Sequence, residues 1–182
     1  MLLIYTSRYL DTLKIKMEIS SKKWISLALS MKYITNATIL ASVIAYYTQA
    51  YWMFLVSIPL LITNAIVMTL LEWFNANELT AAILDIPVSH IGDIEANKTR
   101  FIFLNTVWHW LPLAWVWYVL AKDNLIEVFR PNFMGSFLAS AAFGIGYFYF
   151  ASQGKYYGEI DYSWYMVVYV IVLFTVCVIV YG

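Results

Sequence analysis

The sequence has few charged side chains: Asp, Glu, Lys and Arg make up 12% of its 182 residues, while 63% are hydrophobic. A soluble domain carries about twice that charged fraction and is roughly half apolar. The low charge therefore predicts an integral membrane protein. The 11 basic and 11 acidic residues also balance, so the chain lacks a basic surface for phosphate backbones. We expect membrane lipid as a partner and no nucleic acid.

Few residues in the sequence are suited to hold a metal or a cofactor. Cys177 is the only cysteine, which excludes an intrachain disulfide and a cysteine-rich zinc site. The two histidines, His90 and His109, lie on different expected elements and do not form a metal-binding cluster of fixed spacing. No glycine-rich phosphate loop is present, and residues 162–182 contain no lysine for a retinal Schiff base. We expect no metal and no cofactor.

Charge-free hydrophobic runs divide the chain into membrane spans, each of which needs about 20 residues to cross a bilayer core. Residues 33–71 carry no charge and are too many for one helix, so we expect two helices with a tight turn at YYTQAYW. Residues 24–182 are predicted to form one transmembrane helical bundle, preceded by a cytoplasmic or interfacial N-terminal segment at 1–23. The fold class is an all-α membrane protein with five transmembrane helices, at residues 24–48, 52–74, 101–121, 133–151 and 162–182.

Small residues recur along one of these expected helices. Ser136, Ser140 and Gly144 follow each other at four-residue spacing, which puts them on one helix face. Small side chains so spaced let a neighbouring helix approach closely in a membrane. We expect this face to pack against another helix.

Basic residues are distributed unevenly between the loops. With five spans, the N-terminus and the loops at 75–100 and 152–161 share one side of the membrane, and the opposite side has only Lys122 and Arg130. By the positive-inside rule, we expect a cytoplasmic N-terminus and a C-terminus outside the cell or in the lumen. The membrane would be the endoplasmic reticulum in a eukaryote or the cytoplasmic membrane in a bacterium. The basic residues on the first side are Arg8, Lys14, Lys16, Lys22, Lys23, Lys98, Arg100 and Lys155.

Several polar side chains fall inside the expected spans. At about 1.5 Å per residue, Thr35, Asn64 and His109 lie about 12–16 Å from the cytoplasmic ends of their helices. Asn105 shares a helix face with His109, and unsatisfied polar groups in hydrocarbon are costly, so we expect these groups to line an internal, wet cavity. The alternative for each asparagine is a hydrogen bond that joins two helices, and the alternative for Thr35 is a hydrogen bond to the backbone of its own helix. A functional role is favoured over a structural one only for His109. Glu72, near a helix end, is expected to be solvated.

Tryptophans surround the histidine in the stretch WHWLPLAWVWYV. They lie too deep for all of them to be interface anchors. We expect some of them, Trp108 and Trp115 in particular, to wall a cavity for an apolar ligand, with ordinary core packing as the alternative.

Nucleophilic catalysis needs a hydroxyl or thiol, a base, and a donor for the oxyanion. Thr35 and His109 are candidates for the first two roles, because burial favours the neutral imidazole that can act as a base. The candidates for the oxyanion donor are the amides of Asn36, Asn64 and Asn105.

Two stretches carry a family resemblance: MKYITNATIL at residues 31–40, and NTVWHWLP at residues 105–112. Together they resemble the androgen-induced multipass membrane proteins and their bacterial relatives, a family that includes threonine hydrolases of fatty acid esters of hydroxy fatty acids. The glycine- and tyrosine-rich stretch GKYYGEIDY at residues 154–162 is similar to a loop before the last helix of bacterial members. The residues that match the family pattern are Lys32, Tyr33, Thr35, Asn36, Asn105, His109 and Pro112.

The resemblance implies that Thr35 is the nucleophile and His109 its base. We therefore expect an integral membrane hydrolase of lipid esters. Two alternatives stay open: a non-catalytic lipid or sterol binder, in which Asn and His side chains orient a hydroxyl group, and a small structural subunit of a complex with other membrane subunits. The residues expected to bind substrate are Asn36, Asn64, Asn105, Trp108 and Trp115.

Overall fold

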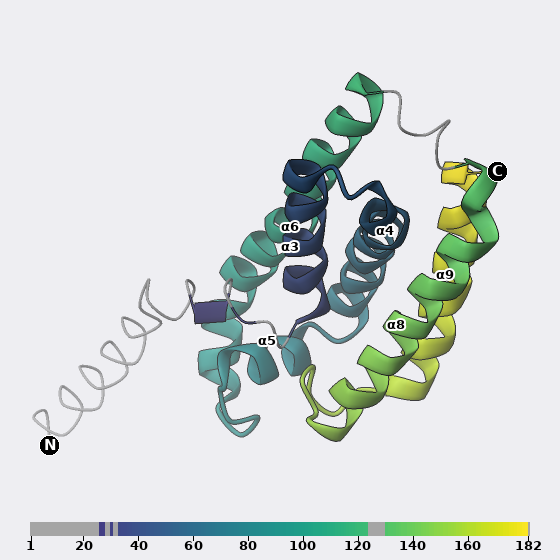
Figure 1. Ribbon diagram of the computed structural model, residues 1–182. Coiled ribbons are helices and arrows are strands. Elements are labelled where there is room, and N and C mark those ends of the chain that lie inside the picture. Colours follow the sequence, from purple (N-terminus) through teal and green to yellow (C-terminus); the bar gives the residue numbers. More distant parts are fainter. Residues whose placement is uncertain (1–25, 28–29, 31–32, 124–129, 182) are drawn as a thin grey trace, which may run out of the picture.

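The computed structural model describes residues 26–27, 30, 33–123 and 130–181, which fold entirely as helices and connections (Figure 1). The expected N-terminal segment at 1–23 and Lys32 lie outside these residues. A short 3-10 helix at Arg130–Asn132 precedes one of the long helices. The six α-helices of the described residues are α3 (Ile34–Thr48), α4 (Tyr51–Phe74), α5 (Ala76–Leu84), α6 (Ile91–Lys122), α8 (Phe133–Gln153) and α9 (Tyr162–Tyr181).

Three helices are long and apolar enough to cross a membrane: Trp52–Phe74 in α4, Phe133–Gln153 in α8 and Tyr162–Tyr181 in α9. At about 1.5 Å per residue, each spans about 30 Å or more, the thickness of a bilayer core. These three spans were predicted, and they support a membrane location. The other two expected spans are not both long and apolar enough: α3 has only 15 residues, and α6 mixes its apolar residues with charged and polar ones.

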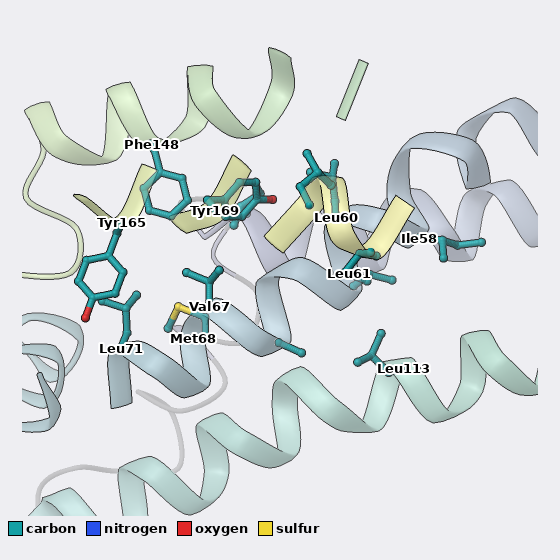
Figure 2. Close-up of a cluster of buried hydrophobic side chains, with 14 of the residues drawn as sticks. Ile58, Leu60, Leu61, Val67, Met68, Leu71, Leu113, Phe148, Tyr165 and Tyr169 are labelled. Carbon is teal, nitrogen blue, oxygen red and sulfur yellow. The ribbon is translucent and has the colours of Figure 1, made fainter. Parts of the chain in front are cut away.

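Helix α4 is the centre of the bundle and contacts α3, α6, α8 and α9. Figure 2 shows part of the buried cluster that α4 forms with three of these helices. The cluster includes Met68 and Leu71 from α4, Leu113 from α6, Phe148 from α8 and Tyr169 from α9. Most of α4 is therefore buried against its neighbours. Four of its polar side chains, Ser57, Thr63, Asn64 and Glu72, are buried in the bundle as well.

The small residues of α8 pack against α4 and α9, as predicted. A Cβ added at Gly144 would lie 2.4 Å from the Tyr169 ring of α9, so only glycine fits there. Ser136 donates its hydroxyl to the carbonyl of Leu55 in α4. That carbonyl lies four residues before Pro59, which has no N–H to offer it. The serine therefore replaces the backbone hydrogen bond that the proline removes, as in other membrane helices with proline.

The first helix boundaries differ from the prediction. The tight turn between α3 and α4 is confirmed, and Gln49 closes α3 in the left-handed conformation with φ 54°. The prediction of one helix over 24–48 is wrong, because α3 begins at Ile34, after an extended Tyr33. In the first turn of α3, the side-chain amide of Asn36 donates to the carbonyl oxygens of Leu27 and Ser30, a local bond that competes with continuation of the helix.

The loop expected at 75–100 is largely helical. It contains α5, which the prediction missed, and the first ten residues of α6. Charged residues marked this region as a loop, but Glu95 and Lys98 lie on α6 as an exposed ion pair with an N···O distance of 2.8 Å. Charge marks where a helix leaves the apolar region and not where the helix ends.

One end of the bundle is closed by α5 and by the connection between α8 and α9, which lie together at the lower end of Figure 1. Gly158 in that connection has φ 85°, and a Cβ there would lie 3.1 Å from the carbonyl oxygen of Glu78 in α5. Asn75, at the start of α5, donates its side-chain N–H to the hydroxyl of Tyr165 in α9. These contacts hold the connection over the bundle and bury Tyr157.

Candidate functional site

A partly open cavity of about 320 Å³ lies where α3, α4, α5 and α6 meet the connection between α8 and α9. Most of its wall is apolar. This composition suits a ligand that is mainly hydrocarbon, with a few polar groups to orient it. The apolar lining residues are Leu27, Met68, Ile83, Phe101, Leu104 and Val107.

The polar part of the wall includes both candidate catalytic residues, Thr35 and His109. It also includes three of the five predicted substrate-binding residues: Asn36, Asn105 and Trp108. The first turn of α3 and the middle of α6 therefore bring together residues that are far apart in the sequence. Asn64 and Trp115, the other two, do not line this cavity.

Thr35 lies in the first turn of α3 and is 3% exposed. Within the part of the chain that the structure describes, its hydroxyl makes no hydrogen bond. Its neighbour Thr38 behaves differently, because that hydroxyl donates to the carbonyls of Ile34 at 3.0 Å and Thr35 at 2.9 Å. Bonding of the Thr35 side chain to its own helix, the alternative interpretation, is thus not seen.

His109 is 6% exposed, and its Nδ1 lies 2.7 Å from the backbone carbonyl oxygen of Asn105. A carbonyl oxygen only accepts hydrogen bonds, so Nδ1 carries the hydrogen and donates it. Nε2 of the neutral ring is then the nitrogen with a free lone pair. No described residue bonds to Nε2, which leaves it available to a ligand in the cavity.

Asn36 joins three segments through its side-chain amide. Its Nδ2 donates to the carbonyl oxygens of Leu27 at 3.0 Å and Ser30 at 2.6 Å. Its Oδ1 accepts the indole N–H of Trp108 at 2.7 Å. Both amide hydrogens are therefore in use, which makes Asn36 a support for the cavity wall and a poor candidate for the oxyanion donor.

Asn105 bonds to a carboxylate that the sequence did not place in the site. Its Nδ2 donates to Oε1 of Glu72 at 2.6 Å, and Thr106 donates to Oε2 of the same carboxylate at 3.1 Å. Glu72 is only 4% exposed, so the expectation that it is solvated is wrong. The reason is tertiary: α6 covers the end of α4 and supplies the two donors. The second N–H of the Asn105 amide remains for a ligand.

Asn64 and Trp115 take part in helix packing. The Asn64 amide donates to the Thr38 hydroxyl at 3.4 Å and accepts the Tyr169 hydroxyl at 2.9 Å, linking α4 to α3 and α9. The Trp115 ring meets Tyr46 edge to face, with centroids 5.6 Å apart. These contacts match the structural alternatives, helix joining for Asn64 and core packing for Trp115.

Two tyrosines, Tyr33 and Tyr157, complete the polar part of the cavity wall, and neither was predicted from the sequence as a catalytic or substrate-binding residue. Tyr157 lines the cavity, shares a hydrogen bond with Tyr147 at an O···O distance of 2.8 Å, and packs 6.0 Å from the ring of Tyr33. Burial raises the pKa of Tyr157 well above the usual value, so its phenol is neutral. The only sequence signal for this residue was the tyrosine-rich stretch of the family resemblance.

No metal-binding group was found in the cavity wall. Among the described residues, no three His, Cys, Asp or Glu side chains gather closely enough to hold a metal ion. His90 lies outside the cavity, exposed, with its Nδ1 3.6 Å from a carboxylate oxygen of Asp93.

The chain matches no protein-family model, no curated protein and no solved structure. Its function is therefore inferred from the groups that line the cavity and from the motifs that carry them.

Proposed function

We propose that this protein is an integral membrane hydrolase of lipid esters, with Thr35 as the nucleophile and His109 as the base. One observation supports the proposal above all others: Thr35 and His109 line the same partly open cavity. Acyl transfer needs a nucleophilic hydroxyl and a base, and among the described residues neither the Thr35 hydroxyl nor Nε2 of His109 has a hydrogen-bond partner. The motif resemblance gives both residues the same roles.

The reaction proceeds in two acyl transfers. Oγ of Thr35 attacks the ester carbonyl carbon while its proton passes to Nε2 of His109. The tetrahedral intermediate then expels the alcohol, which takes the proton from His109 and leaves an acyl ester on Thr35. A water molecule attacks this acyl ester, His109 again accepts and returns the proton, and the fatty acid leaves with Thr35 restored.

The oxyanion of both intermediates needs a hydrogen-bond donor. Of the three asparagines considered, Asn105 suits this role best, because it lines the cavity and keeps one N–H after its bond to Glu72. Asn36 has used both amide hydrogens, and Asn64 lies away from the cavity. We assign Asn105 as the oxyanion donor.

The substrate class follows from the wall composition. Leu104, Val107, Met68 and Phe101 offer hydrocarbon contacts to an acyl chain, and Thr35 and His109 are among the few polar residues of the wall. A fatty acid ester of a hydroxy fatty acid, with hydrocarbon on both sides of its ester, fits such a wall. The alternative is a lipid or sterol binder that uses the same wall without acyl transfer.

The membrane arrangement is part of the proposal. α3 with the residues before it, and residues 101–121 of α6, complete five spans with α4, α8 and α9. The N-terminus is then cytoplasmic, on the side with more basic residues. Cysteine-accessibility labelling of intact cells tests this orientation, with single cysteines placed in the α3–α4 turn and in the connection between α8 and α9. Equal labelling of both positions from one side would contradict it.

The experiment that tests the function measures ester hydrolysis by the purified protein in lipid nanodiscs, with a fatty acid ester of a hydroxy fatty acid. Thr35→Ala and His109→Gln should each lower kcat by at least about 10³-fold, and Thr35→Ser should restore part of it. Thr48→Ala at the far end of α3, whose hydroxyl bonds only to its own helix, is the matched control.

The outcome also separates the two candidate functions. Full hydrolysis by Thr35→Ala would overturn the assignment of the nucleophile. Tight binding of the ester by all variants, with no turnover by the unmodified protein, would favour the lipid binder.

A further inference from the structure

The part of α6 that carries His109 is held by side-chain hydrogen bonds that it donates to two other helices. On one side, Asn105 and Thr106 donate to the Glu72 carboxylate of α4. One turn further along, the indole N–H of Trp110 donates to the Thr69 hydroxyl of α4 at 3.2 Å. The acceptors Thr69 and Glu72 are three residues apart and share one face of α4. α4 thus accepts three hydrogen bonds from α6.

On the other side of His109, α6 is held by α3. The indole N–H of Trp108 donates to Oδ1 of Asn36 at 2.7 Å. Successive residues on an α-helix are turned by about 100°, so His109 lies between Trp108 on one flank and Thr106 and Trp110 on the other. The two sets of bonds fix how far α6 is rotated about its own axis, and this rotation decides whether His109 faces the cavity.

This turn of α6 needs such support, because Pro112 follows His109 by three residues. A proline inside a helix cannot donate to the carbonyl four residues earlier, here that of Trp108, and its ring strains the preceding turn. The helix is therefore weakened at the turn that carries the imidazole. Glu72 is the acceptor of two of the three bonds to α4 and is itself buried among these donors.

We propose that Glu72 is a positioning residue: its carboxylate clamps the Asn105–Thr106 turn of α6 against α4 and so keeps His109 in the cavity wall that it shares with Thr35. This inference rests on the hydrolase function proposed above for its kinetic consequence, but its geometric content does not depend on turnover. Glu72 does not line the cavity, so we assign it no part in proton transfer.

The kinetic test compares three variants by kcat and KM for the same ester. Glu72→Ala removes both acceptor oxygens. We expect kcat to fall about tenfold to a hundredfold with KM nearly unchanged, because a small displacement of a catalytic group slows the chemical step more than it weakens binding. Glu72→Gln keeps an acceptor oxygen of the same size and should retain most of the activity. Glu78→Ala, an exposed carboxylate on α5, is the matched control and should behave as the unmodified protein.

The geometric test needs no activity. Thr35→Cys and His109→Cys are combined in a Cys177→Ala background and treated with a short bifunctional thiol reagent. The cross-linked fraction should fall several-fold when Glu72→Ala is added, and should not change with Glu78→Ala. Thr106→Val, which removes one of the two donors at nearly constant volume, should give a smaller decrease and serves if Glu72→Ala does not fold.

The outcomes distinguish this proposal from the hydrolase proposal. Unchanged cross-linking in both Glu72→Ala and Thr106→Val would overturn the positioning role, whatever the activity of the protein. Loss of all activity in Glu72→Gln with cross-linking intact would also overturn it, because the carboxylate would then act in proton transfer. Full activity in Thr35→Ala would overturn the hydrolase alone.

Discussion

Replacing Gly144 of α8 by alanine places a methyl group where the Tyr169 ring of α9 lies. A Cβ at this position would be 2.4 Å from Cε1 of Tyr169 and 3.1 Å from its Cζ. The ring has little freedom to move, because it is 1% exposed and packs against Phe148 with centroids 5.0 Å apart. Its hydroxyl also donates to Asn64 at 2.9 Å. The clash therefore disturbs a hydrogen bond between α9 and α4 as well.

The expected size of this effect can be worked out from its parts. Forcing an extra carbon into a packed interior lowers the free energy of unfolding by about 1–3 kcal/mol. Weakening the Tyr169–Asn64 hydrogen bond removes about 0.6 kcal/mol, the average for such bonds in membranes. Alanine has a better helix propensity than glycine by about 1 kcal/mol, which offsets part of the loss. We expect Gly144→Ala to lose about 1.5 kcal/mol.

The assay is unfolding in detergent, followed by the reaction of a maleimide dye with Cys177. This residue is the only cysteine and is buried, so the dye reacts as the bundle opens. Gly146→Ala is the matched control on the same helix, because a Cβ there would meet nothing within 4 Å. It should be neutral or slightly stabilising. If Gly144→Ala were as stable as Gly146→Ala, the close approach of α8 and α9 would be refuted.

Three further predictions use the same unfolding assay. Ser136→Ala should destabilise the protein by about 1 kcal/mol. The loss should be smaller in a Pro59→Ala background, because the restored N–H of residue 59 can bond the Leu55 carbonyl. Strictly additive effects of the two substitutions would contradict this coupling. Trp108→Phe should cost about 1–3 kcal/mol, because it leaves the buried Oδ1 of Asn36 without its donor, and unchanged stability would show that the bond contributes nothing. Because the pKa of Tyr157 is raised in the folded state, its contribution to stability is complete below the unfolded pKa of about 10 and is lost as pH rises beyond it. Tyr157→Phe should therefore reduce the loss of stability above pH 10, and an identical pH dependence would exclude this contribution.

The apolar helices were the part of the fold that the sequence predicted well. α4, α8 and α9 begin within one residue of their expected positions, because long charge-free runs in a membrane protein have few other conformations available. The start of α3 was placed too early, since hydrophobicity alone cannot show that the Asn36 side chain bonds two carbonyls before the helix. α5 was missed because it has only 9 residues and carries the polar residues Asn77 and Glu78 in its first turn.

The candidate site was predictable only in part. Thr35, Asn105 and His109 were selected from their depth and helix spacing, and all three line one cavity, although their chemical roles stay predictions. The burial of Glu72 was not predictable, because its donors Asn105 and Thr106 lie more than 30 positions away in the sequence. The position of Glu72 near a helix end indicated contact with water, but α6 packs over this end of α4 and buries the carboxylate.

The most direct test of the central claim is to locate a covalent label. The purified protein is treated with a long-chain fluorophosphonate, whose phosphorus a catalytic hydroxyl attacks with loss of fluoride, and the labelled peptide is identified by mass spectrometry. We predict one label, on Thr35, which is absent from Thr35→Ala and forms much more slowly in His109→Gln. A label on a different residue, or equal labelling of Thr35→Ala, would contradict it.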